Sequence, residues 1–406
     1  MGTLLRLART RAQAGDPRGA VDACSQALAL AAEPTPAEER PGARAAALAG
    51  LLSAEIDAGD LQAARSLIAA VEKAAELGPI EIRSLAFIEV GRARQALGDA
   101  PGAGAAFRNG LELAHADGSK ALALLALQGL GRVARAEGRY EDAREMLTQA
   151  LTRAISLHGE DALQVADVHN DLGMTCKLAG RFIDGRRHYE RALTIFECAL
   201  GSDSLDAATV HHNLGGIEHA RGNFAAAEPH GRAALSIRRQ LLGERHIAVA
   251  ADRAALAAIL DGLGSDVEAE AGYREAIAVF ECAYGPWHHE VGVNLNNLAA
   301  LRQRRGDTDC ADRLYRRALR VKERTLGPEH PETALTMANL AVNHQVAGRP
   351  QAAEAEFLRA LRPLRKLDPT HPWRRACVAN YVALLRESAR ESEAVALEDA
   401  VGQVPK

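Results

Sequence analysis

Apolar side chains recur along the chain at helical spacing, in segments that are separated by glycine. From Ala208 to Ala220, apolar residues are grouped around Leu214 at intervals of three and four. The segment after each glycine repeats another order: a small residue, an aromatic one four positions later, then Ala and Leu or Ile. This order is found in Ala269-Tyr273-Ala276-Ile277, Ala311-Tyr315-Ala318-Leu319 and Ala353-Phe357-Ala360-Leu361. Both spacings place apolar side chains on one helix face, so the pattern predicts paired helices.

Glycines divide this pattern at a nearly constant interval. One series lies within the helix pairs and has a constant 42-residue step from its fourth member on: Gly15, Gly59, Gly98, Gly138, Gly180, Gly222, Gly264, Gly306 and Gly348. A second series, with the same 42-residue step, lies between the pairs: Gly159, Gly201, Gly243, Gly285 and Gly327. Glycine adopts a left-handed backbone at low cost and so ends helices. Each unit is therefore expected to be helix, turn, helix.

The composition favours the same all-α fold. Hydrophobic residues make up 48% of the 406 residues, but aromatic residues only 4%. Such a chain suits many closely packed helices rather than a few large cores. Long runs of β-branched and aromatic residues, which favour sheets, are missing. A chain of this length would ordinarily form two or three domains, whereas the repetition indicates stacked units that contact chiefly their neighbours.

Three features together resemble a known repeat. They are the glycine turns, the Leu-Gly or Leu-Ala pair in each first helix, as in Leu214-Gly215 and Leu298-Ala299, and the loop Leu326-Gly327-Pro328-Glu329-His330-Pro331. The chain resembles the tetratricopeptide repeat, in the 42-residue form of kinesin light chains and their bacterial relatives. The resemblance covers essentially the whole chain and implies a right-handed superhelical solenoid of about ten helix-turn-helix repeats. The early-helix Trp of the general motif is absent.

The regularity of the repeats changes along the chain. We expect residues 1–158 to form four less regular repeats and residues 159–370 to form five 42-residue repeats. Residues 371–406 would form a C-terminal repeat with a capping helix. Glu398 stands there where earlier units carry Tyr or Phe, and a polar residue suits a helix that faces water.

One position of each first helix is expected to point into the concave surface, directly before the core Leu. It is occupied by Asp171, Asn213, Ala255, Asn297, Asn339 and Asn380. A primary amide donates and accepts together, so a row of amides could hold a peptide backbone, and the resemblance implies such a groove. The alternative is that these amides only bond the neighbouring repeat. With flanking positions, the candidate peptide-binding residues are Asn170, Asp171, Lys177, His212, Asn213, His219, Asn296, Asn297, Arg304, Asn339, Asn380 and Arg386.

The charges expected on this face have a modest positive excess. The face collects Arg132, Arg135, Lys177, His212, His219, Arg304 and Arg386 against Asp167, Asp261 and Glu387. Because arginine binds carboxylates in a bidentate manner, an acidic or C-terminal carboxylate peptide is one expected ligand. A charged helix face that is merely solvated is the alternative.

Several classes of function are not expected. A net charge of −4 and a pI near 6.4 count against nucleic-acid binding. The longest apolar run, Ala121 to Leu127, is far too short to span a membrane. Arginines interrupt the apolar residues near the N-terminus, so we expect no signal peptide there. The six cysteines form no Cys-x-x-Cys pair, which indicates free, mostly buried thiols in the cytoplasm. The oligomeric state is left open.

The histidines and glycines form no motif that is typical of a metal-binding, phosphate-binding or catalytic site. His212 and His219 lie seven residues apart, too far to share a metal ion alone. The glycine-rich stretch from Gly98 to Gly104 lies at a repeat turn without a preceding strand, and no nucleophile elbow or phosphate loop is present. We expect no metal, no cofactor and no catalysis. The leading function is a protein-interaction scaffold that binds a peptide or partner protein. The alternatives are a peptide-responsive regulator of a separate effector and an enzyme that uses the groove.

Overall fold

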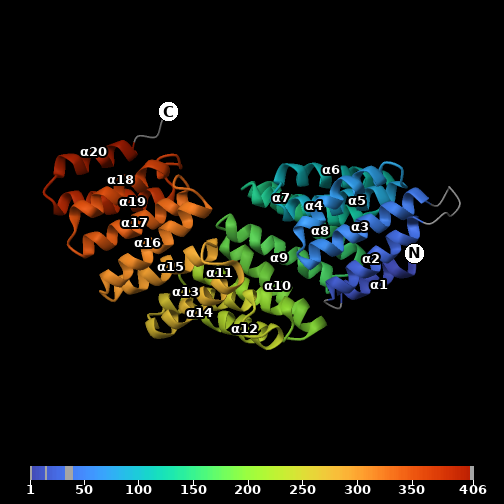
Figure 1. The fold of residues 1–406 in the computed structure, drawn as a ribbon, viewed down its shortest axis with the longest axis horizontal. Coiled ribbons are helices and arrows are strands. Elements are labelled where there is room, and N and C mark those ends of the chain that lie inside the picture. The colour runs from blue at the N-terminus through green and yellow to red at the C-terminus, as the bar shows by residue number, and fades with distance from the viewer. Residues whose placement is uncertain (1, 14–15, 33–39, 403–406) are drawn as a thin grey trace. The chain divides into compact units, whose positions relative to one another are not determined.

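The computed structural model describes residues 2–13, 16–32 and 40–402, and within them the chain forms twenty α-helices and no strand. Gly15, the first turn glycine, lies outside the described residues. The all-α solenoid expected from the sequence is confirmed (Figure 1). The chain divides into two compact units, Met1–Ser204 and Leu205–Lys406. This division differs in kind from the ranges above, which separate repeats by their regularity.

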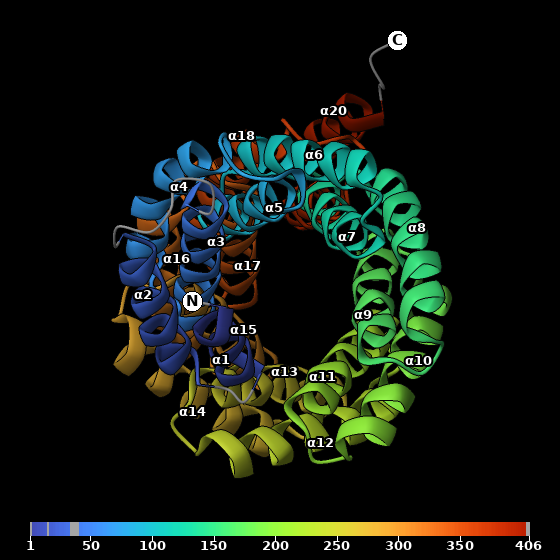
Figure 2. The ribbon, with the colours of Figure 1, turned by 90° about the vertical axis from the view of Figure 1, so that its right-hand side faces the viewer.

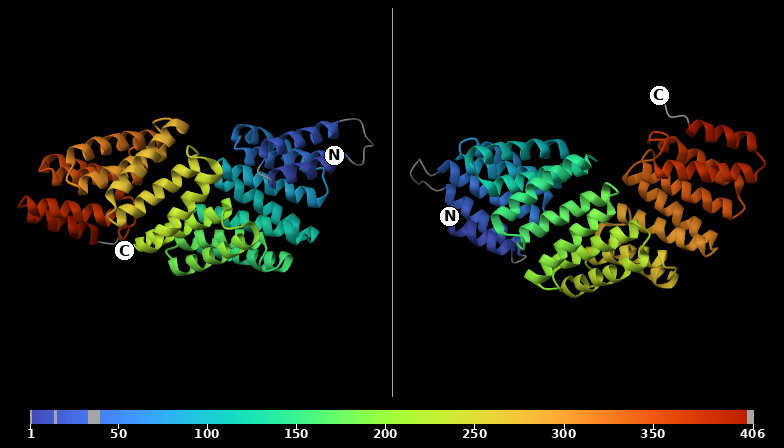
Figure 3. Two further views of the ribbon diagram at one scale, coloured as in Figure 1. Left: turned by 90° about the horizontal axis from the view of Figure 1, so that it is seen from below. Right: turned by 180° about the vertical axis from the view of Figure 1, so that it is seen from behind.

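The first unit contains ten helices in five antiparallel pairs. They are α1 (Gly2–Gln13), α2 (Pro17–Ala32), α3 (Arg40–Ala58), α4 (Leu61–Ala75), α5 (Ile80–Ala96), α6 (Ala100–Asp117), α7 (Lys120–Ala136), α8 (Tyr140–His158), α9 (Leu163–Leu178) and α10 (Phe182–Leu200). Each helix packs against the next one along the chain, as the views of Figure 3 show.

The second unit repeats this arrangement. Its helices are α11 (Leu205–Ala220), α12 (Phe224–Leu242), α13 (Ile247–Gly262), α14 (Asp266–Tyr284), α15 (His289–Arg304), α16 (Thr308–Thr325), α17 (Pro331–Val346), α18 (Pro350–Leu364), α19 (Pro372–Glu387) and α20 (Glu391–Gly402). In α20, Ala394 is the only buried residue whose side chain is described, which suits a terminal helix that faces water.

The odd-numbered helices line the inner side of each unit. Within each unit, every odd-numbered helix contacts the next odd-numbered one, whereas the described parts of the even-numbered helices make no such contact with each other. Helices come closest on the inside of a curve. Figure 2 shows this directly for α5, α7 and α9, which lie inside α6, α8 and α10. The candidate residues all belong to these inner helices.

The turn glycines have the geometry that their spacing predicts. At the end of α13, Gly264 has φ of +76°, its N–H donates to the carbonyl of Asp261 (3.1 Å), and the N–H of Ser265 donates to the carbonyl of Leu260 (2.9 Å). This is the Schellman motif, in which a left-handed residue closes the last helical turn. It recurs at each glycine of the first series from Gly98 to Gly348.

The recurring aromatic residues of the even-numbered helices are core residues, as expected. Tyr189, Tyr273, Tyr315, Phe107 and Phe357 are at most 1% exposed. Their rings pack against small residues of the odd-numbered helices. Gly173, for example, faces the ring of Tyr189, where a Cβ would approach within 2.6 Å. The small residues thus allow each ring to lie between two helices.

Two further expectations concern thiols and membranes. All six cysteines are free, but only Cys24, Cys176 and Cys377 are buried, whereas Cys198 and Cys282 are exposed. The expectation of mostly buried thiols was wrong for the exposed pair, which lie near the solvent-facing ends of outer helices. None of the helices that the structure describes is sufficiently long and apolar to cross a membrane.

Candidate functional site

Three of the predicted amides form a chain between α15 and α17. Asn339 on α17 donates its Nδ2 to Oδ1 of Asn296 on α15 (3.1 Å), and Asn296 donates in turn to Oδ1 of Asn297 (3.4 Å). Asn296 is 8% exposed, and Asn297 and Asn339 are half-buried. Asn296 therefore joins two repeats. Among the described residues, the Nδ2 of Asn297 donates no hydrogen bond, so its two N–H groups are available to a ligand.

On α19, Asn380 and Arg386 differ in their surroundings. Asn380 is exposed, and no hydrogen bond joins its amide to another described residue. Arg386 donates to Glu391 (3.2 Å) and to Glu398 (2.9 Å), both on α20. Its charge is balanced within the last repeat, and Glu398 gains a partner at the position where other repeats carry an aromatic ring.

Arg304 and His212 also bond to neighbouring repeats. Arg304 on α15 forms an ion pair with Asp261 on α13, although burial still raises the pKa of that carboxyl above its ordinary value. His212 on α11 lies with its Nδ1 2.7 Å from Oδ1 of Asp252 on α13. Arg238 of α12 donates to the same oxygen (2.6 Å), and Asp252 is only 1% exposed. These contacts link adjacent helix pairs of the second unit.

The two remaining candidates on α11 have different exposures. Asn213 is 5% exposed, so little of its amide reaches solvent. His219 is exposed and lies edge-on to the ring of Phe224, with 5.3 Å between the ring centroids. Of these two side chains, His219 is the more accessible to a ligand.

In the first unit, Asp171 forms a bridge between α9 and α7. Its carboxylate accepts from Nε of Arg132 (2.7 Å) and from a terminal nitrogen of Arg135 (3.2 Å), and the residue is 6% exposed. The adjacent Asn170 is half-buried. Lys177 is half-buried too, burial lowers its pKa, and no carboxylate among the described residues lies within ion-pair distance of it.

Most of the arginine charge predicted for the inner side is thus already compensated. Arg132 and Arg135 share Asp171, Arg304 pairs with Asp261, and Arg386 pairs with two glutamates. An acidic ligand would have to compete with these carboxylates. These arginines therefore carry less uncompensated positive charge than the sequence analysis expected.

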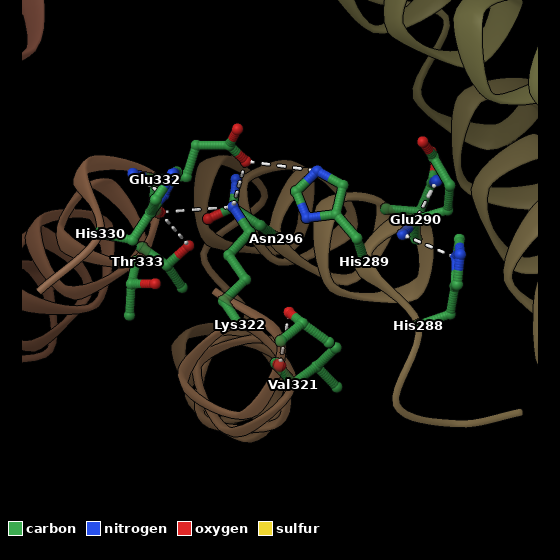
Figure 4. Close-up of polar contacts among 12 residues, drawn as sticks. His288, His289, Glu290, Asn296, Val321, Lys322, His330, Glu332 and Thr333 are labelled. Atoms are coloured by element: carbon green, nitrogen blue, oxygen red, sulfur yellow. Dashed lines mark hydrogen bonds and ion pairs between the residues drawn. The ribbon is translucent and has the colours of Figure 1, made fainter. Parts of the chain in front are cut away.

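Lys322 on α16 is a buried lysine that the sequence analysis missed, and its side chain lies against α15 and α17 (Figure 4). The side chain of Lys322 is 4% exposed, and its Nζ donates to the carbonyl of Glu332 (3.4 Å). The Glu332 carboxylate lies 3.9 Å from that Nζ and 3.5 Å from Nε2 of His289. Burial lowers the pKa of Lys322, opposed by Glu332. A signal was available, because the equivalent positions of the two adjacent repeats hold Phe280 and Leu364.

Two histidine pairs were also missed. His169 and His188 join α9 to α10 with 2.9 Å between their Nδ1 atoms, and His211 and His230 join α11 to α12 at 3.0 Å. Burial, with smaller contributions from His188 and Arg191, lowers the pKa of His169 to about 4. The signal was that both pairs have the same spacing and occupy equivalent positions of consecutive repeats. Among the described residues, no three His, Cys, Asp or Glu side chains are grouped to hold a metal ion.

Comparison with protein families agrees with this geometry. The model of the tetratricopeptide repeat family matches residues 122–198, 164–240, 206–281 and 290–366, which together cover more than half of the chain. The chain belongs to the tetratricopeptide repeat family. Its helix pairs, turn glycines and buried rings are the structural elements of that repeat.

Solved tetratricopeptide-like structures share the fold at low identity. The apo form of the quorum sensor NprR from B. thuringiensis is 11% identical over 89% of this chain and 98% of that chain, with a TM-score of 0.67. A Rap protein complexed with Competence and Sporulation Factor is 15% identical over 88% of this chain and 100% of that chain, with a TM-score of 0.56.

Kinesin light chain repeats are among the similar structures as well. TPR-like repeats of a kinesin light chain from Podosopora anserina are 20% identical over 50% of this chain and 97% of that chain, with a TM-score of 0.44. No curated protein sequence matches the chain.

Proposed function

We propose that the protein is a non-catalytic interaction scaffold that binds a peptide segment along the inner side of α15, α17 and α19. The observation that carries this proposal is the set of amides at Asn297, Asn339 and Asn380, here called the inner-face amides. They recur at equivalent positions, one per repeat. Asn297 and Asn380 keep unused hydrogen-bonding groups in the described structure. Amides of this kind pair with peptide N–H and C=O groups whatever the side chains.

The proposal concerns the ligand's backbone more than its charge. The arginines of the inner side are paired with carboxylates, so an acidic ligand gains less from them than the sequence suggested. Lys177 is the exception in the first unit, since it has no carboxylate partner among the described residues. We therefore expect binding to depend weakly on salt, because exposed charge pairs are what salt screens most.

The similar folds support the scaffold and also a second candidate. A quorum sensor and a Rap protein complexed with Competence and Sporulation Factor share the stacked helices. A regulator that responds to a bound peptide and acts on a separate effector protein is consistent with this likeness. All six cysteines are free thiols, and a reducing compartment keeps cysteines in this form. We therefore propose that the protein is cytoplasmic.

Selection from a random peptide library tests the proposed function. Peptides that bind the full chain would be enriched, and their affinities measured again with the Asn297→Ala/Asn380→Ala double variant. We expect at least about fivefold weaker binding by the double variant, since each neutral hydrogen bond contributes about 0.5–1.5 kcal/mol. Peptides that bind both proteins equally would refute the site. A movement of the helices on peptide binding, seen as a change in small-angle scattering, would favour the regulator.

A further inference from the structure

A cavity of about 140 Å³ lies within the first unit, between α1, α2, α3 and α5. Its apolar lining consists of five alanines and Gly50, together with Leu5, Cys24 and Leu85. Its polar lining is confined to Ser53, Asp57 and Glu89, on α3 and α5. It shares no residue with the inner-face amides.

The cavity stands where other repeats place an aromatic ring. Phe107 lies nine residues after the turn glycine of its own repeat, and Cys24 lies nine residues after Gly15. Gly129 and Gly50 each lie nine residues before the next turn glycine. The ring of Phe107 lies directly against Gly129, whereas a Cβ at Gly50 would meet Sγ of Cys24 at 3.2 Å. A thiol therefore occupies the position of a ring, and the volume that it does not fill forms the cavity.

A missing ring does not by itself leave such a space. Gly231 holds the same position on α12, but a Cβ there would meet methyl groups of Leu256 and Ile259, each at 3.2 Å. Larger neighbours have closed that gap. Around Cys24 the cavity is lined by Ala20, Ala46 and Ala49, and a Cβ at Gly50 would meet only one larger side chain, Leu5 of α1, at 3.5 Å. These side chains leave part of the volume unfilled.

The polar wall of the cavity carries net negative charge. Arg92 donates to Glu89 (2.8 Å), to Asp57 (2.9 Å) and to Ser53 (2.8 Å), but it does not line the cavity. One guanidinium thus serves two carboxylates. Glu89 is 8% exposed, and burial raises its pKa more than Arg92 and Ser53 lower it. An additional cation beside Glu89 would relieve this cost.

We propose that this cavity binds an aromatic ring that carries an ammonium group, with the ring against Cys24 and Gly50 and the ammonium at Glu89 and Asp57. An apolar cavity of roughly 150 Å³ is known to accept a benzene ring. Ammonium–carboxylate hydrogen bonds are about twice as strong as neutral ones. Two sources have this chemistry: the first residue of a peptide that begins with an aromatic side chain, and a free arylalkyl amine.

Binding of benzylamine to the full chain is measured by calorimetry. Benzyl alcohol and benzoate are the comparison compounds, since the first lacks the positive charge and the second carries a negative one. We expect saturable binding of benzylamine, at least tenfold weaker binding of benzyl alcohol, and none of benzoate. Phe-Gly amide and its N-acetylated form distinguish the sources. If the protein binds benzylamine and also Phe-Gly amide, but not its N-acetylated form, the natural ligand is a peptide N-terminus. If it binds benzylamine but neither dipeptide, the natural ligand is a small amine.

Two variants test the two halves of the cavity. Cys24→Phe supplies the ring that other repeats carry, so benzylamine binding should fall at least tenfold while the melting temperature does not fall. Cys198→Phe, the same change at an exposed cysteine, should leave binding unchanged. Glu89→Gln should remove the preference for benzylamine over benzyl alcohol. Wild-type protein that ignores benzylamine, or Cys24→Phe protein that binds it equally well, would overturn the proposal.

Discussion

At the scale of single residues, two adjacent asparagines of α15 have different hydrogen-bond partners. Asn296 accepts from Asn339 in the next repeat, whereas Asn297 accepts only from Asn296 among the residues that the structure describes. The sequence placed both in the groove and left open whether such amides bond a peptide or a neighbouring repeat. It could not separate them, because their roles depend on the rotation between neighbouring helix pairs. That rotation follows from packing in three dimensions, not from helical spacing.

The half-buried pair His169 and His188 makes stability depend on pH. Burial lowers the pKa of His169 to about 4 and lowers that of His188, so the unfolded chain binds more protons between that value and the ordinary pKa of 6.5. Arg191 opposes protonation of His169, and Asp184 favours protonation of His188. This contribution to stability is present above pH 6.5 and is lost as pH falls toward 4.

Urea denaturation at pH 7.5 and pH 5 measures this effect. The wild-type midpoint should fall at the lower pH, and the His169→Asn/His188→Asn variant should lose less. An equal loss in both proteins would mean that other groups cause the pH dependence.

Lys322 is a buried charge at a position that is apolar in the two adjacent repeats. Its equivalents Phe280 and Leu364 belong to the core, and its nearest carboxylate oxygen is 3.9 Å away. Replacing a poorly paired buried charge by an apolar side chain of similar length often stabilises a fold. Lys322→Met should therefore raise the free energy of unfolding by about 1 kcal/mol. The exposed Lys366→Met is the control and should change it by less than about 0.5 kcal/mol. A clearly destabilised Lys322→Met protein would show that the lysine is needed for packing.

At the scale of elements, helix ends were the best predicted feature. The glycine interval located the turns, and the structure shows the Schellman bonds that explain it. Histidines also recur near the 42-residue interval, but their role was not evident from the spacing. Each accepts at its Nδ1 from a backbone N–H two residues on, capping an odd-numbered helix: His246, His288, His330 and His371. A histidine is not among the residues that usually signal an N-cap.

The last turn lacks its glycine and should be improvable. Ala389 has φ of +58°, and Arg390 donates to the carbonyl of Leu385 (2.9 Å), as in the glycine turns. A left-handed alanine costs roughly 1 kcal/mol. Ala389→Gly should therefore stabilise the protein by up to about 1 kcal/mol. The reverse change, Gly348→Ala, should destabilise it by a similar amount, since φ there is +69° and no atom crowds a Cβ. Thermal unfolding of both variants measures this, and an unchanged midpoint for both would contradict it.

At the scale of the whole molecule, the repetition allowed the fold to be predicted from the sequence, but it was less informative about the candidate site. Within each unit, every repeat contacts its neighbours in the chain, so local spacing was enough to predict about twenty helices. Side chains that depart from the repeat were harder to interpret. Cys24, at a position that is aromatic in several repeats, and Lys322, at a position that is apolar in the two adjacent repeats, become visible only when the repeats are compared position by position. The ion pairs that compensate Arg304 and Arg386 follow from packing between neighbouring helices.

The most direct test of the peptide-binding account compares Asn296→Ala with Asn297→Ala, for affinity and for melting temperature. With a library-selected peptide, Asn297→Ala should weaken binding by about 0.5–1.5 kcal/mol and leave the melting temperature nearly unchanged. Asn296→Ala should lower the melting temperature, because Asn339 loses its acceptor. The opposite result, in which Asn297→Ala costs more than about 1 kcal/mol of stability and leaves affinity unchanged, would make both amides struts between repeats and would contradict the account.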